Sequence, residues 1–148
     1  MQLAKAYAAA LVTFLVLDAI WLSVIAFDIF QREAGEILRP EPNLMAAGAF
    51  YVIYMFGLAV LVIGPALREQ SPHMALWRGA VLGLTAYATF DLTSLAVIRG
   101  WTITAAVIDI IWGVAGTTSA AIVGYLAASR GSDLNVGTVP QSPRAGDP

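Results

Sequence analysis

Cysteine is absent from this 148-residue chain, and histidine occurs only once, as His73. The lack of cysteine excludes disulfide bonds, thiolate metal sites and a catalytic cysteine nucleophile. Charge is also scarce: charged residues make up 12% of the chain and apolar residues 59%, whereas soluble domains have about 25% and about 45–50%. A net charge of −2 with no basic cluster argues against nucleic acid as a partner. This composition is typical of a protein whose partner is the lipid bilayer.

The few charges separate four long apolar runs. None of them holds more than one charge, and they cover residues 6–27, 43–67, 79–98 and 100–129. About 20 apolar residues cross a hydrocarbon core of roughly 30 Å, and runs of this length without strict alternation are unlike β-barrel strands. We therefore predict an all-α integral membrane four-helix bundle with antiparallel up-down topology. Its helices are expected at about residues 5–28, 43–66, 75–98 and 102–128.

The two ends of the chain are expected to differ. The first run follows Lys5 as in a signal peptide, but it is longer than the usual ~7–15-residue core of such a segment and contains Asp18. We expect it to be retained as the first helix of a transmembrane domain at residues 1–128. Residues 129–148 are rich in glycine, proline and serine, and we predict a disordered cytoplasmic tail there.

Lysine and arginine residues in the flanks of the runs indicate orientation. One side of the membrane would hold Lys5, Arg68, Arg78 and Arg130, and the other side Arg32, Arg39 and Arg99. This small excess predicts a multi-pass protein of the cell inner membrane with both termini in the cytoplasm.

Three carboxylates inside the runs need an explanation. Asp18, Asp91 and Asp109 each lie ~10–14 Å from the non-cytoplasmic end of their helix, at a rise of ~1.5 Å per residue. A charge at mid-helix costs at least ~2.5–3.5 kcal/mol, so such acids usually face the interior of a bundle. The second run has no acid, but Tyr51 and Tyr54 fall at the same depth. We therefore predict a polar layer across the bundle.

Aromatic residues accompany these acids. Asp18 is followed three positions later by Trp21, and the same spacing joins Asp109 to Trp112. Residues at this spacing share a helix face, so each indole N–H is expected beside its own carboxyl. Tyr87 lies one turn before the acid of the third run. The candidate site residues are Asp18, Trp21, Tyr51, Tyr54, Tyr87, Asp91, Asp109 and Trp112.

The role of the three acids has two open interpretations. They can be hydrogen-bonded to tyrosine, threonine and tryptophan in a dry bundle and serve only to hold helix register. Alternatively, they form a site for a proton, a cation or a substrate. A hard metal ion prefers carboxylate oxygens, but three acids with His73 in a connection are not a specific ligand set, so we expect no metal and no cofactor.

Other features have structural interpretations. Gly79 and Gly83 form a small-xxx-small pattern that favours close helix packing. We expect this contact inside the chain, with a homodimer as the alternative. Trp77 and Trp101 lie near opposite ends of the third and fourth runs and are expected to be interfacial anchors.

Several short motifs together resemble one known family. They are residues 18–22 (DAIWL), 50–54 (FYVIY), 64–67 (GPAL), 87–95 (YATFDLTSL), 99–101 (RGW) and 109–113 (DIIWG). In this order they resemble an uncharacterised bacterial family of predicted four-helix membrane proteins, classed as a domain of unknown function, over roughly residues 1–128. Phe90 and Ser94 depart from the family pattern, which has tyrosine and asparagine there, and this weakens the case for a fixed catalytic network around Asp91. The resemblance implies one shared site or core, but no activity.

Three hypotheses about function remain. The leading one is an inner-membrane protein with a buried Asp/Tyr/Trp site for proton-linked transport or for binding a small or lipid-like ligand. The alternatives are a membrane-embedded lipid-modifying enzyme with one aspartate as general acid or base, and a structural or accessory subunit without a ligand. Transport predicts access of water to the acids from one side, and an enzyme predicts a pocket open laterally to lipid. A structural role predicts a dry and fully satisfied cluster.

Overall fold

The structure, a computed structural model, describes residues 1–35 and 39–136, and within these residues it contains helices and no strands. Its elements are α1 (Gln2–Trp21), the π-helical η1 (Leu22–Ala26), α2 (Phe27–Ala34), α3 (Leu44–Leu58), the π-helical η2 (Ala59–Ile63), α4 (Gly64–Arg68), α5 (Pro72–Val97) and α6 (Ile103–Val136). Four stretches are long and apolar enough to span a membrane, namely Gln2–Glu33, Leu44–Arg68, Pro72–Val97 and Ile103–Arg130. The predicted all-α fold with four membrane-spanning helices is therefore confirmed.

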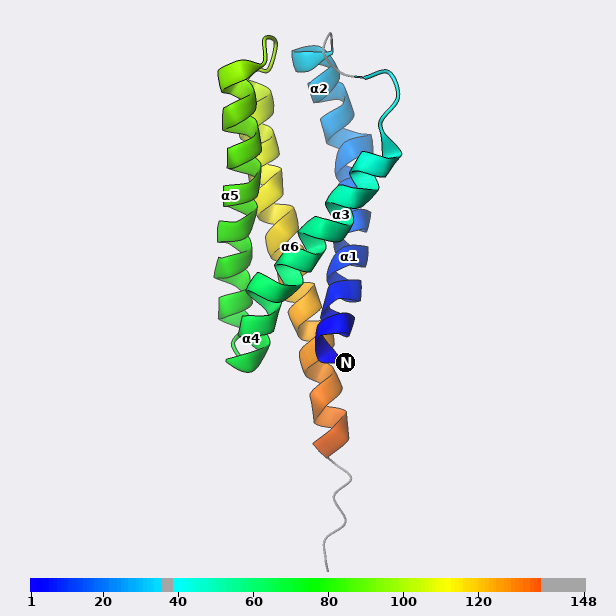
Figure 1. Cartoon of the computed structure of the whole chain (residues 1–148), viewed down its shortest axis with the longest axis vertical. Helices are drawn as coiled ribbons and strands as arrows, with labels where there is room; N and C mark the ends of the chain where they lie inside the picture. The colour runs from blue at the N-terminus through cyan, green and yellow to red at the C-terminus, as the bar shows by residue number, and fades with distance from the viewer. Residues whose placement is uncertain (36–38, 137–148) are drawn as a thin grey trace, which may run out of the picture.

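Figure 1 shows the path of the chain along the long axis of the molecule. The connections at residues 39–43 and 98–102 lie at one end, and the connection at residues 69–71 lies at the other. α6 packs along both α1 and α5. α3 crosses α1 at an angle, and η2 and α4, which continue α3, contact α5 and α6. The direction of each span relative to a bilayer stays a prediction.

The last three spans begin at residues that cap a helix. Asn43, Ser71 and Thr102 each accept, through a side-chain oxygen, a hydrogen bond of 3.1–3.2 Å from the backbone N–H three residues later. Pro72 follows Ser71 at the first helical position, where the missing N–H leaves no hydrogen bond unmade. In the short link between α5 and α6, Gly100 has a φ of 87°, which glycine adopts readily. These residues set the helix starts close to the predicted ones.

Two π-helical turns occur next to residues that disturb helical hydrogen bonding. The Ser23 hydroxyl in η1 donates to the carbonyl oxygens of Ala19 (2.7 Å) and Ile20 (3.2 Å), in competition with the backbone. Pro65, just after η2, has no N–H, and its ring displaces the carbonyl four residues earlier. The wider turns let both helices continue. The first span runs on through α2 and the second runs to Arg68, beyond the ends expected from the sequence.

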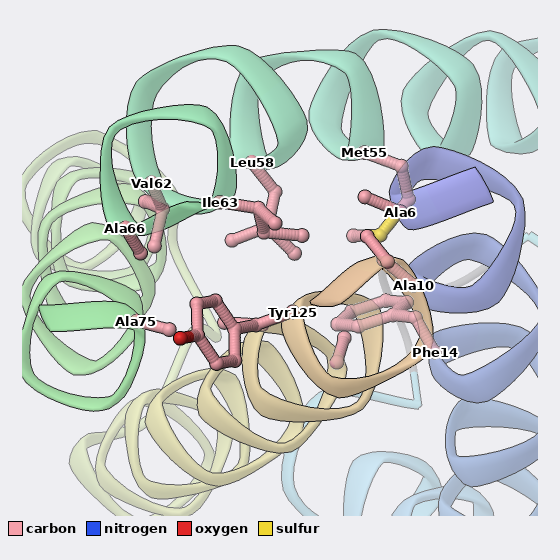
Figure 2. Close-up of a cluster of buried hydrophobic side chains, with 13 residues drawn as sticks. Ala6, Ala10, Phe14, Met55, Leu58, Val62, Ile63, Ala66, Ala75 and Tyr125 are labelled. Carbon is pink, nitrogen blue, oxygen red and sulfur yellow. The ribbon is translucent and has the colours of Figure 1, made fainter. Parts of the chain in front are cut away.

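The half of the molecule nearest the 69–71 connection holds the apolar core, which Figure 2 shows from inside. This core consists of Ala6, Ala10, Phe14, Met55, Leu58, Val62, Ile63, Ala66, Ala75, Ala120, Ala121, Tyr125 and Ala128. More than half of these residues are alanines, whose small side chains let the helices approach closely. The larger ones, such as Phe14 and Ile63, are fully buried between α1, η2 and α6.

Two glycines of α5 bring it into direct contact with α6. A Cβ atom on Gly83 would lie 2.5 Å from the carbonyl oxygen of Gly113, and one on Gly79 would lie 2.9 Å from the Cβ of Ala121. Only glycine fits at these positions, so the predicted small-xxx-small contact lies inside the chain. A homodimer through other surfaces stays a prediction.

The C-terminal helix is longer than expected. α6 extends to Val136, whereas the sequence suggested an end near residue 128. The rest of the predicted disordered tail, residues 137–148, lies outside the described residues.

Candidate functional site

Asp18 connects three helices. It is buried on α1, with 8% of its surface exposed. The Tyr51 hydroxyl of α3 donates to its Oδ2, and the Trp112 Nε1–H of α6 donates to its Oδ1 at 3.2 Å. Both oxygens of this carboxyl therefore have a donor, and the acid holds α1, α3 and α6 in register.

The tryptophans of the two Asp-x-x-Trp motifs stack on each other. The ring centroids of Trp21 and Trp112 are 5.0 Å apart, with an angle of 4° between the ring planes. The expectation that each indole donates to the acid of its own helix is wrong. The Trp112 N–H, on a ring stacked against Trp21, donates to Asp18 of α1, and in the described residues Trp21 makes no hydrogen bond to Asp18.

Asp91 lies on α5 and is completely buried. Its Oδ1 accepts a hydrogen bond from the Trp101 Nε1–H at 3.2 Å, while its Oδ2 has no hydrogen-bond donor among the described residues. Trp101 was expected to be an interfacial anchor. That expectation stays a prediction; in the structure the Trp101 N–H donates to Asp91, and its ring packs on Phe30 and Phe90 with centroid distances of 5.8 Å and 5.6 Å. The short link before α6 allows this indole to fold back over α5.

Asp109 of α6 faces the other acids. Its carboxyl lies within hydrogen-bonding range of the Asp91 carboxyl and within electrostatic range of Asp18. In the part of the chain that the structure describes, no lysine, arginine or histidine pairs with any of the three. Two carboxyl groups form a hydrogen bond only when one of them carries a proton. The Asp91–Asp109 contact therefore needs a proton or a cation for balance.

Two tyrosines, Tyr54 and Tyr87, pack between the helices next to the acids. The Tyr54 hydroxyl of α3 is 2.8 Å from the Thr117 hydroxyl of α6. The Tyr87 ring of α5 meets the Tyr54 ring edge to face, at 6.3 Å and 71°. It also packs so tightly on Gly113 that a Cβ atom there would lie 2.0 Å from the ring. α3, α5 and α6 thus meet at this level.

A cavity of about 400 Å³ lies between the acids and the aromatic rings. It is lined by Asp18, Phe50, Ala86, Tyr87, Phe90 and Asp109. Phe50 and Phe90 come from α3 and α5 and are 42% and 53% exposed, so they lie at its rim. Phe50 of α3 and Phe90 of α5 thus mark the exposed side of the cavity.

A comparison with models of known families shows to which family the chain belongs. Residues 3–126 match a family described as Predicted membrane protein (DUF2177). The chain belongs to this family. No curated protein and no solved structure matches the chain. The DUF2177 profile thus covers the four-helix region and all of the acids and aromatic residues described above.

In this DUF2177 protein the candidate residues fall into three neighbouring groups. Asp18, Tyr51, Trp21 and Trp112 form the first, and Tyr54 and Tyr87 form the second, in which Tyr87 lines the cavity. Asp91 and Asp109 form the third, and Asp109 links it to the cavity. Within the described residues, no three side chains of histidine, aspartate or glutamate are grouped closely enough to hold a metal ion.

The sequence did not reveal several residues of this region. Trp101, Thr117, Phe50 and Phe90 contact the site, but three of them are aromatic residues of the kind that also face lipid. The positions of the three aromatic residues inside the family-like motifs could have indicated them, whereas Thr117 lies outside these motifs. Thr93, two residues after Asp91, does not contribute to this region. Thr93 is exposed, and its hydroxyl donates to backbone carbonyls of its own helix.

Proposed function

We propose that this protein binds a small amphiphilic molecule that enters the cavity between α3 and α5 from the hydrocarbon of the bilayer. The observation that carries the proposal is the lining of the cavity, which combines the carboxyls of Asp18 and Asp109 with aromatic side chains at an exposed rim. A polar group of the ligand would contact the carboxyls, and its apolar part would extend past Phe50 and Phe90 into the lipid. Ligand sites commonly combine an apolar wall with a few polar groups in this way.

A purely structural role for the acids explains only part of this arrangement. Asp18 fits that role, because both of its oxygens accept hydrogen bonds from neighbouring helices. Asp91 does not, because its buried Oδ2 has no donor, and Asp109 borders open space. A helix-locking cluster would be filled and fully satisfied, so the cavity supports a binding role.

We further propose that this multi-pass protein lies in the inner membrane with both termini in the cytoplasm. The excess of basic residues beside the 69–71 connection supports this orientation, which would place the cavity in the half of the bilayer away from the cytoplasm. Glu69→Cys and Glu41→Cys test it, because the chain has no other cysteine and neither change alters the basic residues. A membrane-impermeant maleimide added outside the inner membrane should label Cys at position 41 and not at position 69. The reverse pattern would overturn the orientation.

Filling the cavity tests the proposed function. Ala86 lines the cavity, so Ala86→Phe should occupy it, while Ala96→Phe introduces the same side chain at an exposed position of the same helix. The purified protein and both variants would be incubated with dodecanol, dodecylamine or dodecanoate, and bound molecules counted by native mass spectrometry. We expect at least one probe to bind the parent and Ala96→Phe, and Ala86→Phe to lose it. Equal binding to all three proteins, or no binding of any probe, would overturn the proposal.

A further inference from the structure

The cavity is bordered by more hydrogen-bond acceptors than donors. The two donors that reach Asp18 are already used, Asp91 has one oxygen without a donor, and the described partner of Asp109 is the Asp91 carboxyl. A buried carboxylate without a donor or a cation is unfavourable in a medium of low polarity. A shared proton would satisfy the contact between Asp91 and Asp109, and a ligand that brings both hydrogen-bond donors and positive charge would satisfy these acids and fill the cavity as well.

Resting on the proposed function, we infer that the ligand of this cavity is an amphiphile with an ammonium head group. Its N–H groups would donate to the carboxyl of Asp109, which lines the cavity beside the buried Asp91, and to Asp18. An ammonium group has several donors and no acceptor, so it would supply the donors and the positive charge that Asp91 and Asp109 do not receive from lysine, arginine or histidine in the described residues. Charge-assisted hydrogen bonds of this kind are roughly twice as strong as neutral ones.

The aromatic lining favours the same head group. Phe50, Tyr87 and Phe90 come from two helices and border the cavity next to the acids. A cation near the face of such rings is attracted by their π-electrons, and the attraction is stronger where water is excluded. An anionic head group would be repelled by the carboxyls of Asp18 and Asp109, with the Tyr87 hydroxyl as the one side-chain donor in the lining, and a neutral hydroxyl would supply at most one donor.

The open side of the cavity indicates the rest of the ligand. Phe50 and Phe90 are large, apolar and exposed at the rim, so an alkyl chain leaving the cavity would contact them and then lipid. An ammonium group on such a chain occurs in simple long-chain amines and in aminophospholipids. The shared chemistry is the ammonium group, and the test uses one probe of each kind.

The test compares head groups on the same alkyl chain. Dodecylamine, dodecanol and lysophosphatidylethanolamine would be titrated into the purified full-length protein, with binding measured by native mass spectrometry. We expect dodecylamine to bind roughly tenfold more tightly than dodecanol, which corresponds to about 1.4 kcal/mol. Asp109→Asn should reduce this ratio to near one while dodecanol still binds, which shows that the variant is folded. Asp28→Asn, the same change at an exposed acid, should keep the ratio of the parent.

Each outcome separates this inference from the proposed function. Equal affinity for dodecylamine and dodecanol, or a ratio unchanged by Asp109→Asn, would overturn the ammonium assignment while leaving an amphiphile site in place. No binding of any probe would overturn the proposed function and this inference with it. Tight binding of lysophosphatidylethanolamine would support an ammonium group that belongs to a phospholipid. Binding of dodecylamine alone would support a simple amine.

Discussion

The two halves of this molecule are built from different kinds of side chain. In the half nearest the 69–71 connection, alanine and glycine bring the helices into contact, and the few large residues between them are fully buried. In the half nearest the 98–102 connection, aspartate, tyrosine, tryptophan and phenylalanine take the places between the helices and leave a cavity of about 400 Å³. Small residues allow close approach, whereas rigid rings and carboxyls hold the helices apart.

This difference indicates where stability and function reside. In lipid, helix association depends on van der Waals packing and interhelical hydrogen bonds, because the hydrocarbon around the helices is itself apolar. The alanine–glycine half provides the packing over α5, α6 and η2. The polar half encloses a cavity, and it keeps a buried carboxyl oxygen of Asp91 that has no donor among the described residues. The first half can hold the bundle together while the second binds a ligand.

The largest expected effect on stability comes from a substitution that disrupts the alanine–glycine half. Gly83→Ala would place a Cβ atom 2.5 Å from the Gly113 carbonyl oxygen of α6, so α5 and α6 must move apart. We expect a loss of about 1–3 kcal/mol in the free energy of unfolding, as for other overpacked sites. Gly57→Ala is the matched control, because its Cβ would meet nothing within 4 Å and alanine favours helix by about 1 kcal/mol. Unfolding by SDS in mixed micelles, followed by circular dichroism, measures both.

The two variants should therefore change stability in opposite directions. A Gly83→Ala protein as stable as Gly57→Ala would show that α5 and α6 are not in contact at this position. The separation between the two halves would then lose its physical basis.

The same contrast explains how far the sequence could predict the molecule. The four spans followed from the spacing of charges, and the expected starts at residues 43 and 102 lie within one residue of the starts of α3 and α6. The ends were less accurate at α2 and α4, because π-helical turns next to Ser23 and Pro65 let both helices continue. Hydropathy does not show whether a serine or a proline ends a helix or is accommodated by such a turn.

The polar half was harder to predict because its contacts cross between helices. Residue spacing placed Asp18 and Trp112 in one predicted layer, but it paired Trp112 with Asp109 of its own helix and paired Trp21 with Asp18, to which Trp21 makes no hydrogen bond in the described residues. Which acid an indole reaches depends on helix rotation and on the stacking of Trp21 and Trp112, and neither is encoded in spacing within one helix. The cavity depends on the angle between α3 and α5, which the sequence pattern also leaves open.

An intermediate effect is expected from removing one hydrogen bond in the polar half. Trp101→Phe keeps a ring that can pack on Phe30 and Phe90 but removes the donor to Asp91, so we expect a loss of about 1 kcal/mol in the free energy of unfolding. Trp77→Phe is the matched control, since this indole is 43% exposed and makes no hydrogen bond among the described residues. Denaturant titration of both proteins should show the larger loss for Trp101→Phe. Equal losses would show that the Trp101–Asp91 bond does not contribute.

The smallest effect on stability is expected for Asp91→Asn, and this substitution can raise the free energy of unfolding. The Oδ1 of asparagine can still accept from Trp101, and its NH₂ group becomes available to donate to the Asp109 carboxyl, where the native structure has two facing acceptors. We expect stability to stay within about 0.5 kcal/mol of the parent or to rise by up to about 1 kcal/mol.

The contrasting change, Asp91→Leu, leaves the Trp101 N–H without its acceptor and should lower stability by about 1–3 kcal/mol. The same SDS titration measures both variants, and the difference between them is the informative quantity. If Asp91→Asn destabilised the protein as much as Asp91→Leu, the second oxygen of Asp91 would have to be satisfied in the native protein. The acids would then form a filled structural cluster like the core of the other half, and the polar half would no longer have a carboxyl group waiting for a ligand.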